Sequence, residues 1–206
     1  GVTIQEAVDA ALRAGTTIAD VLQTVAAVAA TGAPTLVMSY WNPIERYGVD
    51  RFAKDLAVAG GVGTITPDLT PDEAAPWLQA SDAVGLDRVF LVAPSSTDVR
   101  LRYTVEHCRG FVYAASTMGV TGTRTSMGTA GRVLVERVRG VTDLPVGVGL
   151  GVSTGAQAAE VATYADAVIV GSAFVRRLLD APTPDQGVRA VAELAAELAR
   201  GVRARG

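Results

Sequence analysis

The segment Leu144-Pro-Val-Gly-Val-Gly-Leu-Gly-Val-Ser153 decides the fold, because a short apolar run passes directly into a glycine-rich turn. Two further turns have this form: Gly119-Val-Thr-Gly122 follows Phe111-Val-Tyr-Ala-Ala115, and Gly171-Ser172 follows Ala167-Val-Ile-Val170. A parallel strand that ends in glycine lets backbone N–H groups come close to an anion, and a helix that begins there adds the positive end of its dipole. The three turns therefore predict one shared phosphate-binding pocket.

Working outward from these turns, apolar runs of strand length alternate with longer segments of helical period. We expect strands at residues 35–40, 63–66, 88–92, 111–115, 146–149 and 167–170. We expect helices at residues 3–13, 18–31, 49–59, 71–84, 98–108, 130–139, 153–164, 172–179 and 184–202. Gly15 and Gly32 are expected to end the first two helices, and Ser153 to cap the seventh. This alternation predicts a parallel sheet covered by helices.

The number of strands favours an incomplete barrel. The expected strands begin about 26 residues apart, and two helices precede the first of them. Six strands fall two short of a (β/α)8 TIM barrel, a fold of about 250 residues. We expect a single TIM-barrel domain over residues 1–206 in which the first two strands and the helix between them are not represented. Because the sequence begins with Gly1, we expect roughly fifty to sixty residues to precede it.

Composition and charge exclude several classes of protein. The chain has 206 residues, of which 49% are hydrophobic and 19% charged, enough for one buried core. A net charge of −3 with scattered cations argues against nucleic acid as a partner. No apolar run reaches the roughly eighteen residues of a membrane span, and no signal peptide is visible, so we expect a cytoplasmic protein.

His107 and Cys108 are the only histidine and cysteine of the chain, and they are neighbours. Adjacent residues of a helix do not face each other, so a catalytic pair is not expected there. Two residues are also too few for a zinc or haem site, and we expect no metal. The simplest interpretation is the end of a helix.

The glycines of residues 147–151 also invite comparison with a dinucleotide fingerprint. The G-x-G-x-x-G spacing fails, because Val152 or Thr154 stands where the third glycine is required. In TIM barrels, phosphate sites are often built by the loops after strands seven and eight and a short extra helix, and Gly151, Gly171 and Ser172 fit that pattern. The alternative is that these glycines only form tight turns.

Seven segments of the chain occur together in a characteristic order. They are Tyr40-Trp-Asn-Pro43 with Tyr47-Gly48, Pro67-Asp68, Phe90-Leu-Val-Ala-Pro94, Gly110-Phe-Val-Tyr-Ala114, Gly119-Val-Thr-Gly122, Val148-Gly-Leu-Gly151 and Val170-Gly-Ser172. With them the chain resembles the tryptophan synthase alpha subunit family, from just after the second strand of that family to its C-terminus. The resemblance covers essentially all 206 residues.

The resemblance implies a lyase that splits indole-3-glycerol phosphate into indole and glyceraldehyde 3-phosphate by a retro-aldol reaction. It implies no metal and no organic cofactor. A glutamate and an aspartate carry the acid and base work in the family, and the aspartate lies directly before the glycine that matches Gly1. The chain as shown therefore lacks both carboxylates. Asp68 is the alternative acid at a strand end, whereas Glu45 and Asp50 are interpreted as loop charges.

The resemblance also implies the residues of the substrate site. Tyr113 and Thr121 are expected to support catalysis, Tyr113 from the pocket wall and Thr121 from a mobile loop over residues 118–130. The phosphate is expected at Gly122, Gly151, Gly171 and Ser172, and further pocket candidates are Tyr40, Leu150 and Ile4.

A partner is implied as well. Family members dock on a pyridoxal-phosphate-dependent beta subunit in an alpha2-beta2 heterotetramer, and indole passes to it through a tunnel. The pyridoxal phosphate belongs to the beta subunit. The expected docking residues are Trp41, Asn42, Pro43, Asp68, Leu69 and Pro71.

Two other functions remain open. A different phosphate-binding barrel enzyme would be expected to carry a catalytic lysine or aspartate at a strand end, but Lys54, the only lysine, lies in an expected helix. A non-catalytic protein that binds a phosphate ligand and activates a beta subunit is the second alternative.

Overall fold

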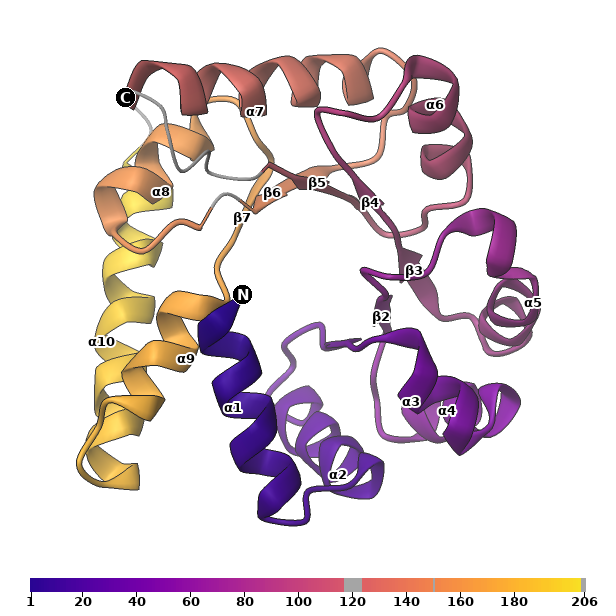
Figure 1. Ribbon diagram of the computed structural model, residues 1–206, viewed down its shortest axis with the longest axis vertical. Coiled ribbons are helices and arrows are strands. Elements are labelled where there is room, and N and C mark those ends of the chain that lie inside the picture. The colour runs from indigo at the N-terminus through magenta and orange to yellow at the C-terminus, as the bar shows by residue number, and fades with distance from the viewer. Residues whose placement is uncertain (117–123, 150, 205–206) are drawn as a thin grey trace.

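The computed structural model describes the backbone of residues 1–116, 124–149 and 151–204, and the side chains of these residues except 124–128. Within this part, parallel strands form a curved arc with most helices on its outer side (Figure 1). The strands are β1 (Leu36–Met38), β2 (Gly63–Ile65), β3 (Asp87–Val89), β4 (Leu91–Val92), β5 (Val112–Ala115), β6 (Val146–Gly149) and β7 (Ala167–Ile169). The alternation of strands and helices read from the sequence is thus confirmed.

The helices follow the expected positions closely. They are α1 (Val2–Arg13), α2 (Ile18–Ala29), α3 (Trp41–Tyr47), α4 (Val49–Val58), the 3-10 turn η1 (Pro71–Glu73), α5 (Ala75–Val84), α6 (Asp98–Glu106), α7 (Arg124–Arg139), α8 (Gly155–Ala162), α9 (Ser172–Leu179) and α10 (Pro184–Arg203). Gly15 and Gly32 follow α1 and α2 with φ of 82° and 86°, a conformation that suits glycine. Both expected stops are confirmed.

Some local expectations were wrong. Residues 41–47, expected as a loop, form α3. The expected strand over residues 88–92 is divided into β3 and β4 at Phe90. The N-cap of α8 is Thr154, not Ser153, because the Thr154 hydroxyl accepts from the Gln157 backbone N–H.

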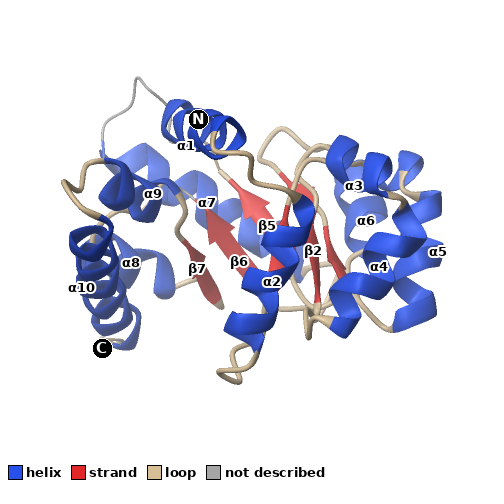
Figure 2. Cartoon of the chain, turned by 90° about the horizontal axis from the view of Figure 1, so that it is seen from below, coloured by secondary structure: helices blue, strands red, loops and turns tan. Residues whose placement is uncertain are grey.

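Strand pairing places successive residues on opposite faces of the arc. Val112 and Ala114 of β5 pair with Val146 and Val148 of β6, and all four are buried under the helices. Tyr113, between them, points to the other face. Figure 2 shows the arrows of β5 and β6 running in the same direction. The helix-covered face therefore holds the aliphatic core, and the inner face is left for other side chains.

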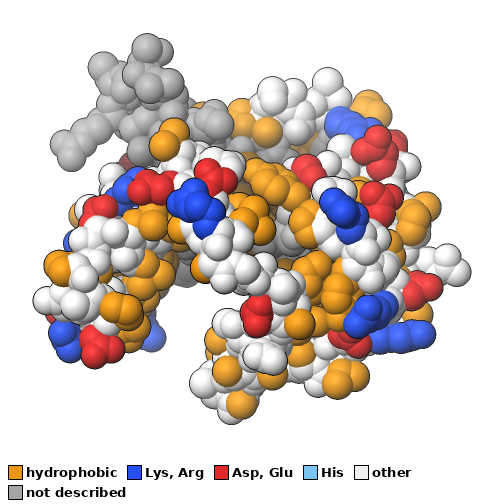
Figure 3. All heavy atoms as spheres, turned by 60° about the horizontal axis from the view of Figure 1, so that its bottom comes forward, with side chains coloured by type: hydrophobic (Ala, Val, Ile, Leu, Met, Phe, Trp, Pro, Cys, Tyr) orange, Lys and Arg blue, Asp and Glu red, His pale blue; other side chains and the backbone are white. Residues whose placement is uncertain are grey.

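The arc is open at both ends among the described residues. Strand β1 pairs only with β2, and β7 pairs only with β6. Several apolar side chains of the N-terminal elements are exposed, among them Val8 and Leu12 of α1 and Met38 of β1. Figure 3, which looks from the lower side of Figure 1 where α1 and α2 lie, shows hydrophobic side chains between the charged ones.

The structure confirms the helix end at His107. This residue is the C-cap of α6, and its Nδ1 lies 2.7 Å from the Tyr103 carbonyl oxygen. Cys108 is buried, and its thiol donates to the Thr104 carbonyl at 3.5 Å. No cluster of His, Cys, Asp and Glu side chains suited to a metal ion occurs among the described residues. None of the helices in the described ranges is long and apolar enough to cross a membrane.

Cys108 should make the stability depend on pH in the alkaline range. Burial raises the pKa of its thiol from 9.0 to about 11, so the folded chain holds the proton more tightly than the unfolded chain. This contribution is complete below pH 9 and is lost as the pH rises toward about 11, at up to about 1.4 kcal/mol per pH unit. Urea unfolding at stepped pH measures it.

The matched control is Cys108→Ser, which cannot titrate in this range. The variant should lose less stability between pH 9 and 11 than the original chain, since the tyrosines contribute equally to both. Parallel stability curves would contradict the assignment.

Candidate functional site

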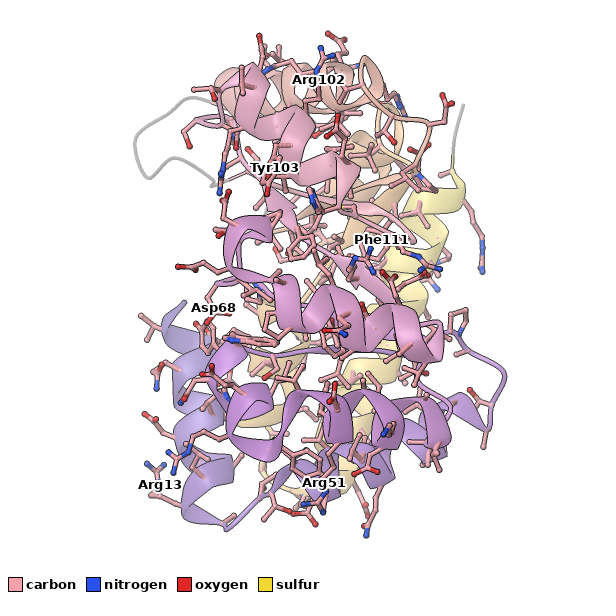
Figure 4. The ribbon with its side chains drawn as sticks, turned by 90° about the vertical axis from the view of Figure 1, so that its right-hand side faces the viewer. Arg13, Arg51, Asp68, Arg102, Tyr103 and Phe111 are labelled. Carbon is pink, nitrogen blue, oxygen red and sulfur yellow. The ribbon has the colours of Figure 1, made fainter. Side chains whose placement is uncertain are left out.

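The ends of the strands define where a site can form. All strand pairs are parallel, so the carboxyl ends lie together on one side of the arc. Asp68, after β2, lies toward one side in Figure 4, and Phe111, before β5, lies toward the other. The turns after β6 and β7 therefore share a side with Asp68.

Tyr113 lies across the backbone of Gly149 on the inner face. A methyl group added to Gly149 would lie 2.5 Å from the Tyr113 hydroxyl oxygen, so only glycine leaves room for this ring. Gly147 is crowded in the same way, because an added methyl group would meet Ile169 at 3.0 Å and Phe111 at 3.4 Å. From the sequence, these two glycines were considered only as part of a glycine-rich turn, and it was not predicted that they make room for large side chains. Their spacing of two residues in a strand was the available signal, since it places both on one face.

The environment of Tyr113 keeps its phenol neutral. The side chain is half-buried, and this burial raises the pKa of its hydroxyl above the ordinary value. At neutral pH the hydroxyl therefore remains protonated and can donate a hydrogen bond into the barrel. The inward orientation expected for Tyr113 is confirmed by its contact with Gly149.

Helices α8 and α9, which follow the last two glycine turns, differ in which groups accept hydrogen bonds from the backbone N–H groups of their first turns. At α8, the Gly155 N–H donates to Glu197 Oε1 at 2.7 Å, and Thr154 caps the Gln157 N–H. A carboxylate of α10 thus occupies the positive end of α8. The positive end of α8 is thus already engaged by a carboxylate that lies 42 residues away in the chain.

The start of α9 is open. Its N-cap is Gly171, and no described side chain caps it. Both Gly171 and Ser172 are exposed, and apart from the chain neighbours of Gly171 no heavy atom of the described residues lies within 4 Å of a methyl group placed on it. The first N–H groups of this helix and the Ser172 hydroxyl can therefore meet an incoming anion.

The other expected substrate residues that the structure describes, Gly151, Tyr40 and Ile4, lie in three different parts of the fold. Gly151 has φ of 70° in the turn after β6, which suits glycine. Tyr40 is the N-cap of α3 and is 64% exposed, and Ile4 lies on α1 with 37% exposure. Neither side chain is closed into a core. The expected residues Thr121, Gly122 and Leu150, and residues 118–123 of the expected loop, lie outside the described residues. The rest of the loop expected over residues 118–130 was wrong, because α7 begins at Arg124 and not at residue 130.

The expected docking residues form two groups. Asn42, Pro43 and Asp68 are exposed, and Trp41 is half-buried with its ring centroid 6.4 Å from that of Trp77. Leu69 and Pro71 are buried in this chain and so are not exposed to a partner. Asp68 joins the two loops, because its carboxylate oxygens accept from the Trp41 N–H at 3.0 and 3.1 Å.

Comparison with known proteins identifies the family. The model of the family described as "Tryptophan synthase alpha chain" matches residues 1–203. The chain belongs to this family. It is 66% identical to the tryptophan synthase alpha chain of Salinispora arenicola over 203 residues, which is 98% of this chain and 76% of that relative. Over 207 residues it is 65% identical to the protein of the same name from Thermobifida fusca, covering 99% and 77% of the two chains.

Solved structures agree. A tryptophan synthase structure from M. tuberculosis, described as an aminoacrylate- and BRD0059-bound form, matches with a TM-score of 0.88 and 54% identity over 98% of this chain and 74% of that chain. The alpha subunit from Legionella pneumophila str. Paris has a TM-score of 0.88 at 30% identity, over 98% and 76% of the two chains. The TIM-barrel fold is confirmed, and the chain spans about three quarters of the length of these relatives.

The crowding at Gly149 predicts a local packing defect. We expect Gly149→Ala to displace the Tyr113 ring and to cost about 1–3 kcal/mol of unfolding free energy, as overpacking does. Gly140→Ala is the control, because its added methyl group meets only the Arg137 carbonyl at 3.4 Å and that of Glu136 at 3.6 Å. Urea unfolding measures the free energy, and near-ultraviolet circular dichroism monitors tyrosine. Equal stability of the two variants would show that the Tyr113 ring can move away from residue 149 without a cost in unfolding free energy.

Proposed function

We propose that this member of the tryptophan synthase alpha chain family cleaves indole-3-glycerol phosphate to indole and glyceraldehyde 3-phosphate. The observation that carries the proposal is the open start of α9 at the carboxyl end of β7, in a chain of this family. An uncapped helix start with two exposed N–H donors and a serine hydroxyl suits the phosphate of such a substrate. Gly171 and Ser172 would bind it there, together with Gly151.

The reaction needs three groups around the indole. A base takes the proton of the side-chain hydroxyl, the bond between the indole carbon and the glycerol chain breaks, and an acid protonates that carbon. A third group stabilises charge at the indole nitrogen. Tyr113, neutral and inward-facing, is suited to orient the substrate as a hydrogen-bond donor. Tyr40 and Ile4 are proposed as further pocket residues, and Thr121, Gly122 and Leu150 remain predictions from the resemblance.

We place the acid and the base outside residues 1–206. Asp68, the carboxylate considered as an alternative, is exposed and already engaged by the Trp41 N–H through both oxygens. The missing strand partners at β1 and β7 among the described residues support the same proposal. The 206-residue chain alone would then bind the phosphate without turning the substrate over.

We also propose a beta subunit as the partner, in an alpha2-beta2 assembly. The matching M. tuberculosis structures are described as tryptophan synthase. On this chain the exposed residues Asn42, Pro43 and Asp68, with Trp41 behind them, provide a polar and aromatic docking surface. The alpha chain itself would need no cofactor, and pyridoxal phosphate would belong to the beta subunit.

The first test is release of indole. A protein that joins residues 1–206 to the segment encoded before Gly1 should release indole from indole-3-glycerol phosphate, and faster with a beta subunit present. Residues 1–206 alone should release none but should still stimulate the beta subunit if docking is retained. Absence of indole from the longer protein, with stimulation retained, would favour the alternative of a non-catalytic activator.

The second test concerns the phenol of Tyr113. Tyr113→Phe keeps the ring over Gly149 and removes one donor, so turnover in the longer protein should fall by about tenfold, the effect of one lost hydrogen bond to a developing charge. Stability should change little. Tyr103→Phe is the control, because Tyr103 lies on α6, away from the inner face (Figure 4). An unchanged rate in Tyr113→Phe would remove that residue from the site.

A further inference from the structure

Helix α1 is held by few contacts. It has no fully buried residue, and α9 is the element that it touches most. Its half-buried residues include Thr3, Ala7 and Ala11, spaced four apart, which form one stripe along the helix. Val2 and Leu12 of the same helix are 84% and 66% exposed. Small side chains allow the two helices to approach closely but bury little apolar surface.

One side chain of α9 supplies the polar contacts to α1. Arg176 Nη2 donates to the Thr3 hydroxyl at 2.8 Å, and its Nη1 lies 3.3 Å from Glu6 Oε2. The same Nη1 lies 3.4 Å from Asp180 of its own helix. The two contacts to α1 join residues that are 173 and 170 positions apart in the chain. Figure 1 shows α1 and α9 side by side, with the N-terminus of the chain near the start of α9.

Arg176 is also aligned with the start of its own helix. It lies four residues after Ser172, and residues four apart share a face of a helix. The face of α9 that carries Ser172 is therefore the face that meets the first turn of α1, where Thr3 and Ile4 lie. Any movement of α1 relative to α9 changes the space beside Ser172.

We propose that Arg176 is a positioning residue that fixes the first turn of α1 against the start of α9 and so sets the width of the phosphate-binding end of the site. The inference rests on the proposed function, which places the substrate phosphate at Gly171 and Ser172. In this proposal the contacts of Arg176 are those with Thr3, Glu6 and Asp180, and not with the phosphate or the reacting atoms. It acts through α1, and its guanidinium suits this role because one planar group reaches a hydroxyl and a carboxylate at once.

The test compares variants in the protein that carries the segment before Gly1. Arg176→Gln should raise the KM for indole-3-glycerol phosphate and the inhibition constant of inorganic phosphate by about fivefold each, with kcat within about twofold, because ground-state and transition-state binding are weakened equally. Arg176→Lys should recover part of the affinity through Glu6. Arg177→Gln is the matched control, since Arg177 is exposed on the same helix and has no ion pair or side-chain hydrogen bond among the described residues.

Hydrogen exchange supplies a readout that needs no activity. Backbone amides of α1 should exchange faster in Arg176→Gln than in the original protein. Added inorganic phosphate should slow this exchange less in the variant than it does in the original protein. Glu6→Gln combined with Thr3→Val should reproduce the effect from the other helix, and adding Arg176→Gln to that pair should change little more.

Two results would overturn the inference. One is unchanged exchange in α1 when Arg176 is replaced. The other is a lower melting temperature with unchanged KM and phosphate inhibition, which would make the contact merely structural. If the original protein releases no indole, the proposed function fails, and the role of Arg176 is still decided by the exchange of α1 and its response to phosphate.

Discussion

The close contact between the Tyr113 ring and the backbone of Gly149 is the constraint around which the inner face is arranged. Neighbouring strands of a sheet are only about 5 Å apart, so a large side chain on one strand needs a small one beside it. Strand β6 meets this need with glycine at both of its inward positions, 147 and 149, beneath Phe111, Ile169 and Tyr113. Its outward positions, Val146 and Val148, are fully buried under the helices. One strand thus closes the core on one face and leaves room for an inward-facing tyrosine on the other.

The contrast between α8 and α9 shows how neighbouring helices with similar sequence signals acquire different chemistry. Both follow a parallel strand and a glycine. The start of α8 is occupied by Glu197, and close packing of Gly201 against the Gly155 carbonyl brings the two helices together there. The start of α9 has no such acceptor among the described residues. The start of α9 is therefore more available to an anion than the start of α8, where Glu197 already accepts from the first turn.

Much of the fold follows from local pattern, and the remainder depends on contacts between distant residues. Periodicity and glycine stops were sufficient for the strands and for most helices, because each is a local property. Helix α3 was missed because the cap of its first turn, Asp68, lies 27 residues away. The occupied start of α8 was missed for the same reason. The resemblance to the family supplied the expected residues of the site, whereas the contact of Tyr113 with Gly149 required the register of β5 and β6.

The unpaired edges of β1 and β7 have a consequence for how residues 1–206 behave in solution. Their outer backbone N–H and C=O groups have no strand partner among the described residues, and Met38 of β1 is 55% exposed. Natural sheets protect such edges with charges, proline or closure into a barrel, because an open edge is a template for another chain. Two copies that meet edge to edge could satisfy these groups together. Self-association of residues 1–206 through β1 and β7 is therefore a physical consequence of these open edges, and strand pairing at both edges would suppress it.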